Sequence, residues 1–184
     1  MDEFRSGNGA AWLDLLATVN GRYRPVSDDA IETPAALRAW LSANAMEPTS
    51  AVTDGDVRQF QTIREALHHL AAASVRGEPM PTPDVRLLTL ALQGDRALNV
   101  RRHRDGLAIG RPATAAEALG RLARSAVHDL SDRYAPQLRA CGDDTCSGIF
   151  LDPTGRRRWC SDERCGNRMR VRAHRAQRAR TQQP

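Results

Sequence analysis

Residues 141–175 read "CGDDTCSGIFLDPTGRRRWCSDERCGNRMRVRAHR" and contain all four cysteines of the 184-residue chain. The cysteines form two pairs, Cys141 with Cys146 and Cys160 with Cys165, with four residues inside each pair and thirteen between the pairs. Two close pairs joined by a short insert are the usual pattern of one tetrahedral zinc site with four thiolate ligands. Four buried free thiols or two disulfides are the alternatives, and a reducing compartment disfavours the disulfides.

A zinc ion held by these four thiolates would have a structural role. Four protein ligands close the coordination sphere, so no position is left for a water molecule. The segment also contains few large apolar residues, and metal binding would therefore supply most of its folding free energy. We predict one structural zinc ion and no catalytic site.

The insert between the two cysteine pairs predicts a β-hairpin. Residues 149–152 (IFLD) and 156–160 (RRRWC) flank Pro153-Thr154-Gly155, a sequence typical of strand, turn and strand. This hairpin would bring the second pair of cysteines back beside the first. Side chains alternate along a strand, so Arg156 and Arg158 would share one face.

A helix is expected after the last cysteine. We expect Gly166 to adopt backbone angles closed to other residues and Asn167 to cap the helix. Met169, Ala173 and Ala176 lie at helical spacing and would form a thin apolar stripe that rests on the hairpin and on Trp159. Arginines occupy both flanks of this stripe.

Positive charge is concentrated in the last quarter of the chain. Residues 1–133 carry 16 Arg and 17 acidic residues, a net charge of −1, whereas residues 134–184 carry 11 Arg and 5 acidic residues, a net charge of +6. A zinc ion with four thiolates is formally −2, which leaves +4 on this module. Clustered arginine on a small scaffold is typical of nucleic-acid binding. We favour DNA; RNA, a protein partner and a purely structural zinc module are the alternatives.

The candidate DNA contacts are the arginines of the insert and of the final helix. We favour Arg170, Arg172 and Arg175, while Arg168 is equally suited to hydrogen-bond the carbonyls beside the cysteines. The full candidate set is Arg168, Arg170, Arg172, Arg175, Arg178, Arg156 and Arg158.

The rest of the chain predicts a mainly α-helical domain over residues 1–135, with the zinc module over residues 136–184. Apolar periodicity, glycine or proline stops and N-caps at Thr33, Thr53, Thr82 and Thr114 predict helices at residues 10–19, 34–44, 53–76 and 82–93, and one from Thr114 up to Tyr134. Residues 97–111 instead suggest a hairpin that turns at Asp105-Gly106.

Residues 1–135 show no recognisable catalytic constellation, so we do not expect an enzyme. His68 and His69 are adjacent on one helix and point about 100° apart, which excludes a pair on one face. Arg64 could bind an anionic ligand, but an ion pair with a nearby acid is the favoured interpretation.

Composition supports a soluble globular protein, with 41% hydrophobic and 27% charged residues. The first residues lack the basic start of a secretion signal, and no run approaches the roughly 18 apolar residues of a spanning helix. We expect a cytoplasmic protein that does not contact a membrane.

Two stretches of the chain resemble known families. The residues Cys165-Gly166-Asn167-Arg168, together with FLDPTGRRRWCSDERCGNR (150–168) and the upstream cysteine pair, resemble the CGNR zinc finger. LDLLATV (13–19), TPAALRAWL (33–41) and IREALHHL (63–70) resemble the ABATE domain, which precedes this finger in stress-induced transcriptional regulators of bacteria. The Asn-Thr pair of that domain is Ala17-Thr18 here.

The resemblance implies a DNA-binding transcriptional regulator whose N-terminal domain senses an unknown small molecule or stress signal. A protein-interaction module without direct DNA contact is the alternative function. A single finger of this size would read few base pairs, which makes a homodimer a reasonable hypothesis.

Overall fold

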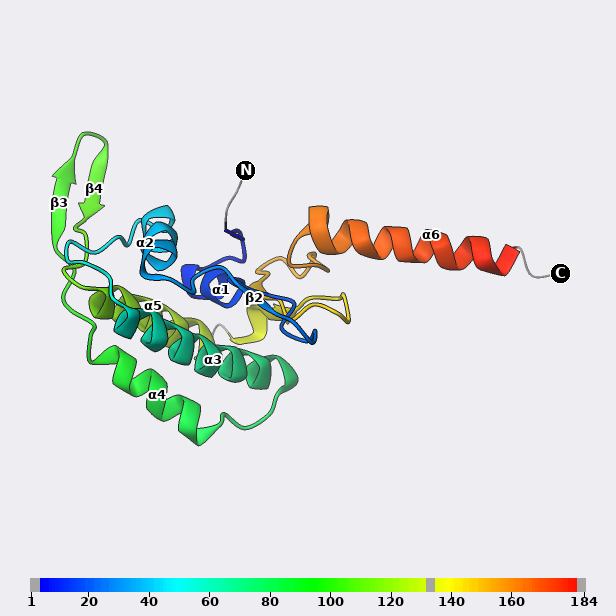
Figure 1. Ribbon diagram of the computed structural model, residues 1–184, viewed down its shortest axis with the longest axis horizontal. Coiled ribbons are helices and arrows are strands. Elements are labelled where there is room, and N and C mark those ends of the chain that lie inside the picture. The colour runs from blue at the N-terminus through cyan, green and yellow to red at the C-terminus, as the bar shows by residue number, and fades with distance from the viewer. Residues whose placement is uncertain (1–3, 132–134, 182–184) are drawn as a thin grey trace.

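The computed structural model describes residues 4–131 and 135–181, and it shows a helical body from which one helix projects (Figure 1). This mainly α-helical class agrees with the sequence prediction. The body contains five helices: α1 (Ala11–Leu16), α2 (Pro34–Ala43), α3 (Asp54–Arg76), α4 (Thr82–Leu92) and α5 (Ala115–Leu130). The projecting helix is α6 (Asn167–Thr181).

The predicted helix caps are confirmed at three of the helices, but the predicted cap Thr82 is wrong, because it is the first residue of α4 and Pro81 occupies the cap position without a side-chain hydrogen bond. The Thr33 hydroxyl accepts a hydrogen bond from the Ala36 N–H at the start of α2. Thr53 and Asp56 form a reciprocal capping box at the start of α3, and Gly77 ends that helix with φ +66°. Thr114 caps α5.

The ends of two predicted helices differ in the structure. The first helix stops at Leu16, because the Thr18 hydroxyl donates to the Leu15 carbonyl and the chain then enters the short strand β1 (Val19–Asn20), which pairs with β2 (Asp28–Asp29). The last helix of the body stops at Leu130, and Tyr134 lies outside the described residues.

The hairpin predicted near residue 100 is present, with its turn one residue earlier than expected. Strand β3 (Val100–His103) pairs with β4 (Gly106–Ile109), and His103 faces Gly106. The turn residues are therefore Arg104 and Asp105 rather than Asp105 and Gly106. The hairpin stands away from the helices and its side chains are largely exposed (Figure 1).

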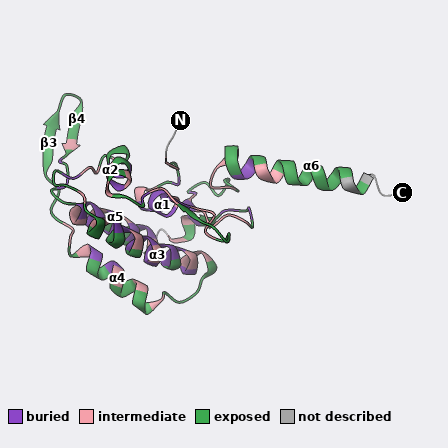
Figure 2. Cartoon of the chain, viewed as in Figure 1, coloured by how far each residue is buried: buried purple, intermediate pink, exposed green. Residues whose placement is uncertain are grey.

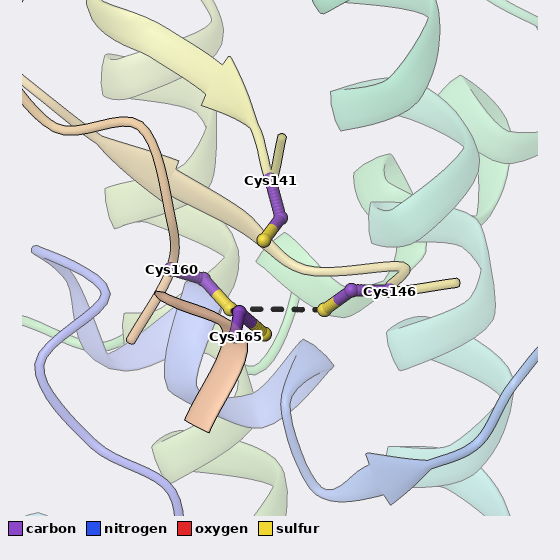
Figure 3. A group of neighbouring side chains, drawn as sticks. All are labelled: Cys141, Cys146, Cys160 and Cys165. Atoms are coloured by element: carbon purple, nitrogen blue, oxygen red, sulfur yellow. Dashed lines mark hydrogen bonds between the residues drawn. The ribbon is translucent and has the colours of Figure 1, made fainter. Parts of the chain in front are cut away.

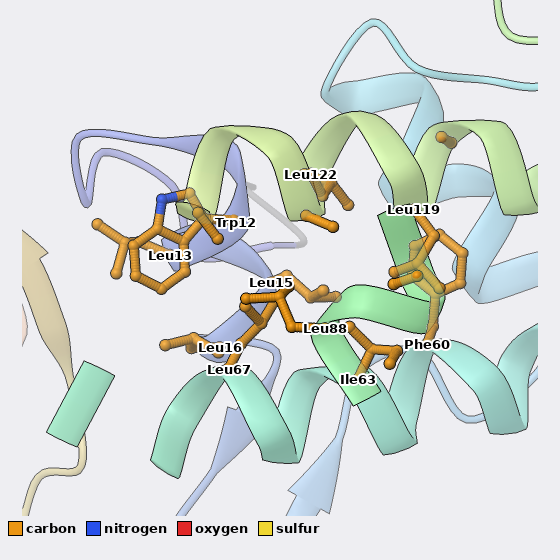
Figure 4. Close-up of a cluster of buried hydrophobic side chains, with 14 of the residues drawn as sticks. Trp12, Leu13, Leu15, Leu16, Phe60, Ile63, Leu67, Leu88, Leu119 and Leu122 are labelled. Carbon is orange, nitrogen blue, oxygen red and sulfur yellow. The ribbon is translucent and has the colours of Figure 1, made fainter. Parts of the chain in front are cut away.

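The main core lies between α1, α3 and α5 (Figure 4). Trp12, Phe60, Leu67 and Leu119 are fully buried there, as the apolar face of each helix predicts. The Trp12 indole N–H, which would be costly to bury alone, donates to the Asp129 carboxylate at 2.7 Å.

The hairpin of the cysteine module forms from different strands than the sequence suggested. Strand β6 (Ile149–Leu151) pairs with β5 (Leu138–Ala140), which precedes the first cysteine, and residues 156–160 form no strand. The Asp152 carboxylate closes the following turn instead, because it accepts hydrogen bonds from the N–H groups of Thr154 and Arg157 and from the Thr154 hydroxyl. The returning segment joins the first cysteine loop through the Gly142 N–H, which donates to the Arg158 carbonyl.

The cysteine module also packs on the helical body. Leu138 and Ile149 are buried in the same core cluster as the residues of α1 and α3. The Leu151 N–H donates to the Asn8 carbonyl at 2.8 Å, so the N-terminal segment lies along β6. Both the apolar core and the backbone hydrogen bonds thus hold the module against the body.

Candidate metal centre and C-terminal helix

The four cysteines converge from three separate segments (Figure 3). Cys141 follows β5, Cys146 lies in the loop before β6, and Cys160 and Cys165 flank the segment that leads into α6. Their sulfur atoms all lie within 4.8 Å of one another. The predicted cluster is therefore present, and its cysteines are free thiols rather than disulfides.

The spacing of the sulfur atoms fits a tetrahedral zinc ion. The Zn–S bond of about 2.3 Å implies sulfur atoms roughly 3.8 Å apart. The Sγ atoms of Cys146 and Cys160 are 3.7 Å apart, as are those of Cys160 and Cys165. The donor set of four soft sulfur ligands is also that of a structural zinc site, so the cluster can hold one zinc ion.

The electrostatics of the cluster also favour a bound cation. Burial and the negative charge of Cys146 and Cys141 raise the pKa of the Cys165 thiol to about 12. Four thiols this close cannot all ionise without a positive charge among them. A bound zinc ion would supply that charge and keep all four as thiolates.

Gly148 leaves space beside the sulfur atoms, and Gly166 leaves space beside Asp162 and Trp159. A Cβ at Gly148 would lie 2.8 Å from the Cys160 Sγ, and one at Gly166 would lie 2.4 Å from the Asp162 carboxylate. The prediction that Gly166 needs unusual backbone angles is wrong, because its φ is not in the left-handed region. The nearest atom belongs to the exposed Asp162 carboxylate, which can move aside, so neither backbone angle nor space strictly requires glycine there.

The start of the last helix also differs from the prediction. A π-helical turn, η2 (Asp162–Gly166), runs directly into α6, so Asn167 lies inside continuous helix with φ −63°. The cap is Ser161, whose hydroxyl accepts a hydrogen bond from the Arg164 N–H. The fourth cysteine is therefore held within the first helical turn.

Arg168 fastens this helix to the first cysteine loop. Its Nε donates to the Asp143 carboxylate at 2.5 Å and its Nη2 contacts the Cys165 Sγ at 3.2 Å. Asp143 is fully buried and also accepts hydrogen bonds from the N–H and hydroxyl of Thr145. Burial raises the pKa of Asp143, but the bonds from Thr145 and Arg168 outweigh it and hold this pKa below its usual value.

The other candidate arginines of α6 fall into two groups. Arg170 pairs with Asp162, and Arg172 pairs with Asp144 at 2.9 Å. Arg175 and Arg178 are exposed and make no ion pair within the described residues. The acidic residues therefore neutralise the base of α6 and leave its far half positively charged.

The apolar stripe of α6 does not pack on the hairpin. Met169 is half-buried, but Ala173 and Ala176 are exposed, because α6 leaves the body after its first turn (Figure 2). The prediction that this stripe rests on the hairpin and Trp159 is wrong. The small alanine side chains offer too little apolar area to hold the helix down.

The three arginines of the insert have separate roles because no strand forms there. Arg157 stacks on the Phe150 ring at 4.5 Å and donates to the carbonyls of Gly7 and Cys160. The Arg158 guanidinium lies 5.4 Å from the Trp159 ring. Arg156 is exposed. Sequence reasoning missed the structural role of Arg157, because Gly7 lies 150 residues away and the contacts with Phe150 and Cys160 depend on how the loop folds.

The favoured interpretation of Arg64 is confirmed. Its guanidinium forms two 2.7 Å hydrogen bonds with the Asp29 carboxylate and one of 2.8 Å with the Thr18 hydroxyl. His68 is buried, and burial and the nearby Arg22 lower its pKa to about 4, so this histidine is neutral. His69 is exposed beside Asp84.

Comparison with known families agrees with this geometry. A family model described as ABATE, "Putative stress-induced transcription regulator", matches residues 9–133. The chain belongs to the ABATE family. A second model, the CGNR zinc finger, matches residues 137–178 and so covers the four cysteines and most of α6. No curated protein matches the chain.

The ABATE match covers the helical body and the CGNR match covers the cysteine module. Both families are described in regulatory or zinc-finger terms and neither as enzymes. Across residues 4–131 and 135–181, no helix has the length and apolar character needed to span a bilayer.

Proposed function

We propose that this ABATE protein is a bacterial transcriptional regulator that binds DNA through the far half of α6. The observation that carries the proposal is that α6 projects from the body with Arg175, Arg178 and Arg180 exposed and without an acidic partner in the described part of the chain. A projecting basic helix can reach a groove that the body itself cannot enter.

The structure suggests an order among the candidate contacts. Arg175, Arg178 and Arg156 are the strongest candidates for phosphate contacts, because no carboxylate competes for them among the described residues. Arg170 and Arg172 form exposed ion pairs, which are weak enough to exchange a carboxylate for a phosphate. Arg168 positions α6 through Asp143.

The division of labour proposed here assigns residues 1–135 to sensing and residues 136–184 to DNA binding. A structural zinc ion at Cys141, Cys146, Cys160 and Cys165 would hold the base of α6 in place. The binding partners of the protein would then be DNA and a signal molecule in the cytoplasm. A homodimer would present two copies of α6 to the DNA.

Titration of labelled duplex DNA with the zinc-loaded protein tests the proposal. We expect the affinity to fall steeply as salt rises, since each neutralised phosphate changes the slope of log K against log salt by about −0.9. Arg175→Ala with Arg178→Ala should reduce the magnitude of this slope by about 2. Arg102→Ala with Arg104→Ala, in the distant β3–β4 hairpin, is the matched control and should leave the slope unchanged.

A protein-interaction function without DNA contact is the second candidate. It is favoured by the β3–β4 hairpin, where Val100, Leu107 and Ile109 are 52%, 80% and 60% exposed. Such apolar side chains on a projecting hairpin are typical of a contact surface. Absence of binding at about 50 mM salt to random-sequence duplexes would reject the DNA proposal and favour this one.

A further inference from the structure

We propose that the protein binds a small phosphate-bearing anion in an arginine-lined cavity between the helical body and the first cysteine loop. The cavity has a volume of about 140 Å³, about ten times the space that one water molecule requires. Four arginines line it: Arg5, Arg22, Arg24 and Arg168. Its remaining lining contains hydroxyl and amide groups, and no carboxylate.

Two of these arginines have buried nitrogens without a partner. The Nε and Nη2 atoms of Arg22 and the Nε of Arg5 are buried and form no hydrogen bond within the described residues. Buried polar groups are almost always hydrogen-bonded, and a guanidinium left unsatisfied is especially costly. These nitrogens have almost no exposed surface in this conformation, so an oxyanion in the cavity would reach them only after the side chains of Arg5 and Arg22 turn toward it.

The charges around the cavity are only partly balanced. Glu65 pairs with Arg22, and Asp143 pairs with Arg168. Arg5 and Arg24 have no acidic partner among the residues that the structure describes. The guanidinium groups of Arg5 and Arg24 therefore remain available to an anion, and they also face the formal −2 charge of the zinc–thiolate cluster, whose ligand Cys146 lines the cavity.

Local backbone geometry builds this cavity from the loop between β1 and β2. Gly21 has φ +68°, and its carbonyl accepts a hydrogen bond from the Arg24 N–H at 2.7 Å. A Cβ at Gly21 would lie 3.1 Å from the Arg24 Cδ, so the arginine side chain folds across the glycine. The tight turn brings Arg22 and Arg24 to the same cavity.

The nearby cysteine sulfur does not satisfy these donors. Cys146 lines the cavity, but the hydrogen bond to its Sγ comes from the Gly148 N–H. The Arg168 guanidinium, in contrast, contacts both the Cys165 Sγ and Asp143. An anion here would therefore lie beside Arg168, the residue that positions α6. A signalling role for the site rests on the proposed function, whereas anion binding itself does not.

Calorimetric titration of the zinc-loaded full chain with inorganic phosphate, at ionic strength held constant with chloride, tests the site. We expect saturable binding, and at least about tenfold weaker binding for Arg5→Ala with Arg24→Ala. These two residues are chosen because Arg22→Ala removes the partner of Glu65 and so endangers folding. Arg102→Ala with Arg104→Ala is the matched control and should bind phosphate like the unchanged protein.

Both inorganic phosphate and adenosine monophosphate would place the same oxyanion among the arginines. Comparing their affinities in parallel titrations therefore distinguishes a site for an esterified phosphate from a site for the free ion. Equal phosphate binding by the Arg5/Arg24 variant, or no phosphate binding by the unchanged protein, would overturn the proposal. If phosphate does not bind but this variant loses duplex affinity, the cavity receives a DNA phosphate instead. Phosphate binding without any DNA binding would reject the proposed function and leave the site intact.

Discussion

At the scale of single residues, the buried charge of Arg64 holds two segments of the helical body together. Its side chain is 5% exposed and holds Asp29 of β2 and Thr18 before β1. Burial raises the pKa of Asp29, but hydrogen bonds from Arg64, Ile31 and Gln61 outweigh it and hold this pKa below its ordinary value. The pair thus fastens the loop that carries Arg22 and Arg24.

Arg64→Ala should lower the free energy of unfolding at pH 7 by about 3 kcal/mol, because it leaves a partly buried carboxylate unpaired. Urea unfolding measures this, with the exposed Arg58→Ala on the same helix expected within about 0.5 kcal/mol of the unchanged protein. A loss no larger than that of Arg58→Ala would contradict the structural role of the pair.

The lowered pKa of Asp29 predicts a direction of pH dependence. A carboxyl whose pKa is lower in the folded than in the unfolded state stabilises the fold above its unfolded pKa, and this contribution is lost as pH falls through the folded value. Asp29→Asn should therefore be destabilising at pH 7, and the difference from the unchanged protein should shrink below about pH 4. A difference independent of pH would show that the charge is not responsible.

At the scale of elements, α5 approaches the end of α4 closely enough to require a glycine. A Cβ at Gly120 would lie 2.3 Å from the Asp95 N and 2.7 Å from the Gly94 carbonyl carbon. These contacts are with backbone, which cannot move aside as a flexible side chain can. Helix propensity alone would favour alanine at this position.

Gly120→Ala should therefore lower the free energy of unfolding by about 1–3 kcal/mol, although the same change stabilises most helices. Gly55→Ala in α3 is the matched control, since its Cβ would meet only the Thr53 hydroxyl at 3.4 Å. We expect that variant to be neutral or more stable by up to about 1 kcal/mol in urea unfolding. Equal effects at both positions would argue against the close approach.

The cysteine module is the element that depends most on a ligand. Removal of zinc by a chelator, or Cys160→Ser, should abolish hydrogen-exchange protection in residues 138–178. Without a complete metal site, the cysteine side chains no longer link the loops to one another. Metal analysis should give one zinc per unchanged chain and well under one for Cys160→Ser. Arg156→Ala, an exposed change in the same insert, should retain both the zinc and the protection.

At the scale of the whole molecule, the N-terminal segment joins the cysteine module to the body. The Asn8 carbonyl bonds to β6, and Arg157 reaches the Gly7 carbonyl. Gly9 has φ +99°, and a Cβ there would lie 2.7 Å from the Leu151 Cβ. The module and the body therefore share a contact that a side chain at residue 9 would open.

Gly9→Ala should destabilise the cysteine module more than Gly7→Ala does, by about 1–3 kcal/mol. Gly7 also has a positive φ of 85° but nothing within 4 Å of its Cβ position, so both variants carry backbone strain and only the first adds a clash. Hydrogen exchange of β6 in the zinc-loaded proteins measures the difference. Equal protection in the two variants would show that the contact contributes nothing.

Local signals in the sequence were sufficient for most of the secondary structure. Thr33, Thr53 and Thr114 cap helices as predicted, because a capping hydroxyl acts on N–H groups only two or three residues away. The helical class and the two cysteine pairs could be predicted for the same reason, since periodicity and ligand spacing lie within short windows. The strand pairing of β6 could not, because residues 156–160 compete for it with β5 and nothing local decides between them.

The sequence by itself determined the two cysteine pairs that form the cluster, the helical body and the excess of positive charge near the end of the chain. Only the tertiary structure decided which arginines are neutralised, since Asp143, Asp144 and Asp162 meet α6 across the cysteine cluster. It alone also gathered Arg5, Arg22, Arg24 and Arg168 around one cavity. The physical reason is that charge acts through space at a few ångströms, and the separation of two residues along the chain does not reveal that distance.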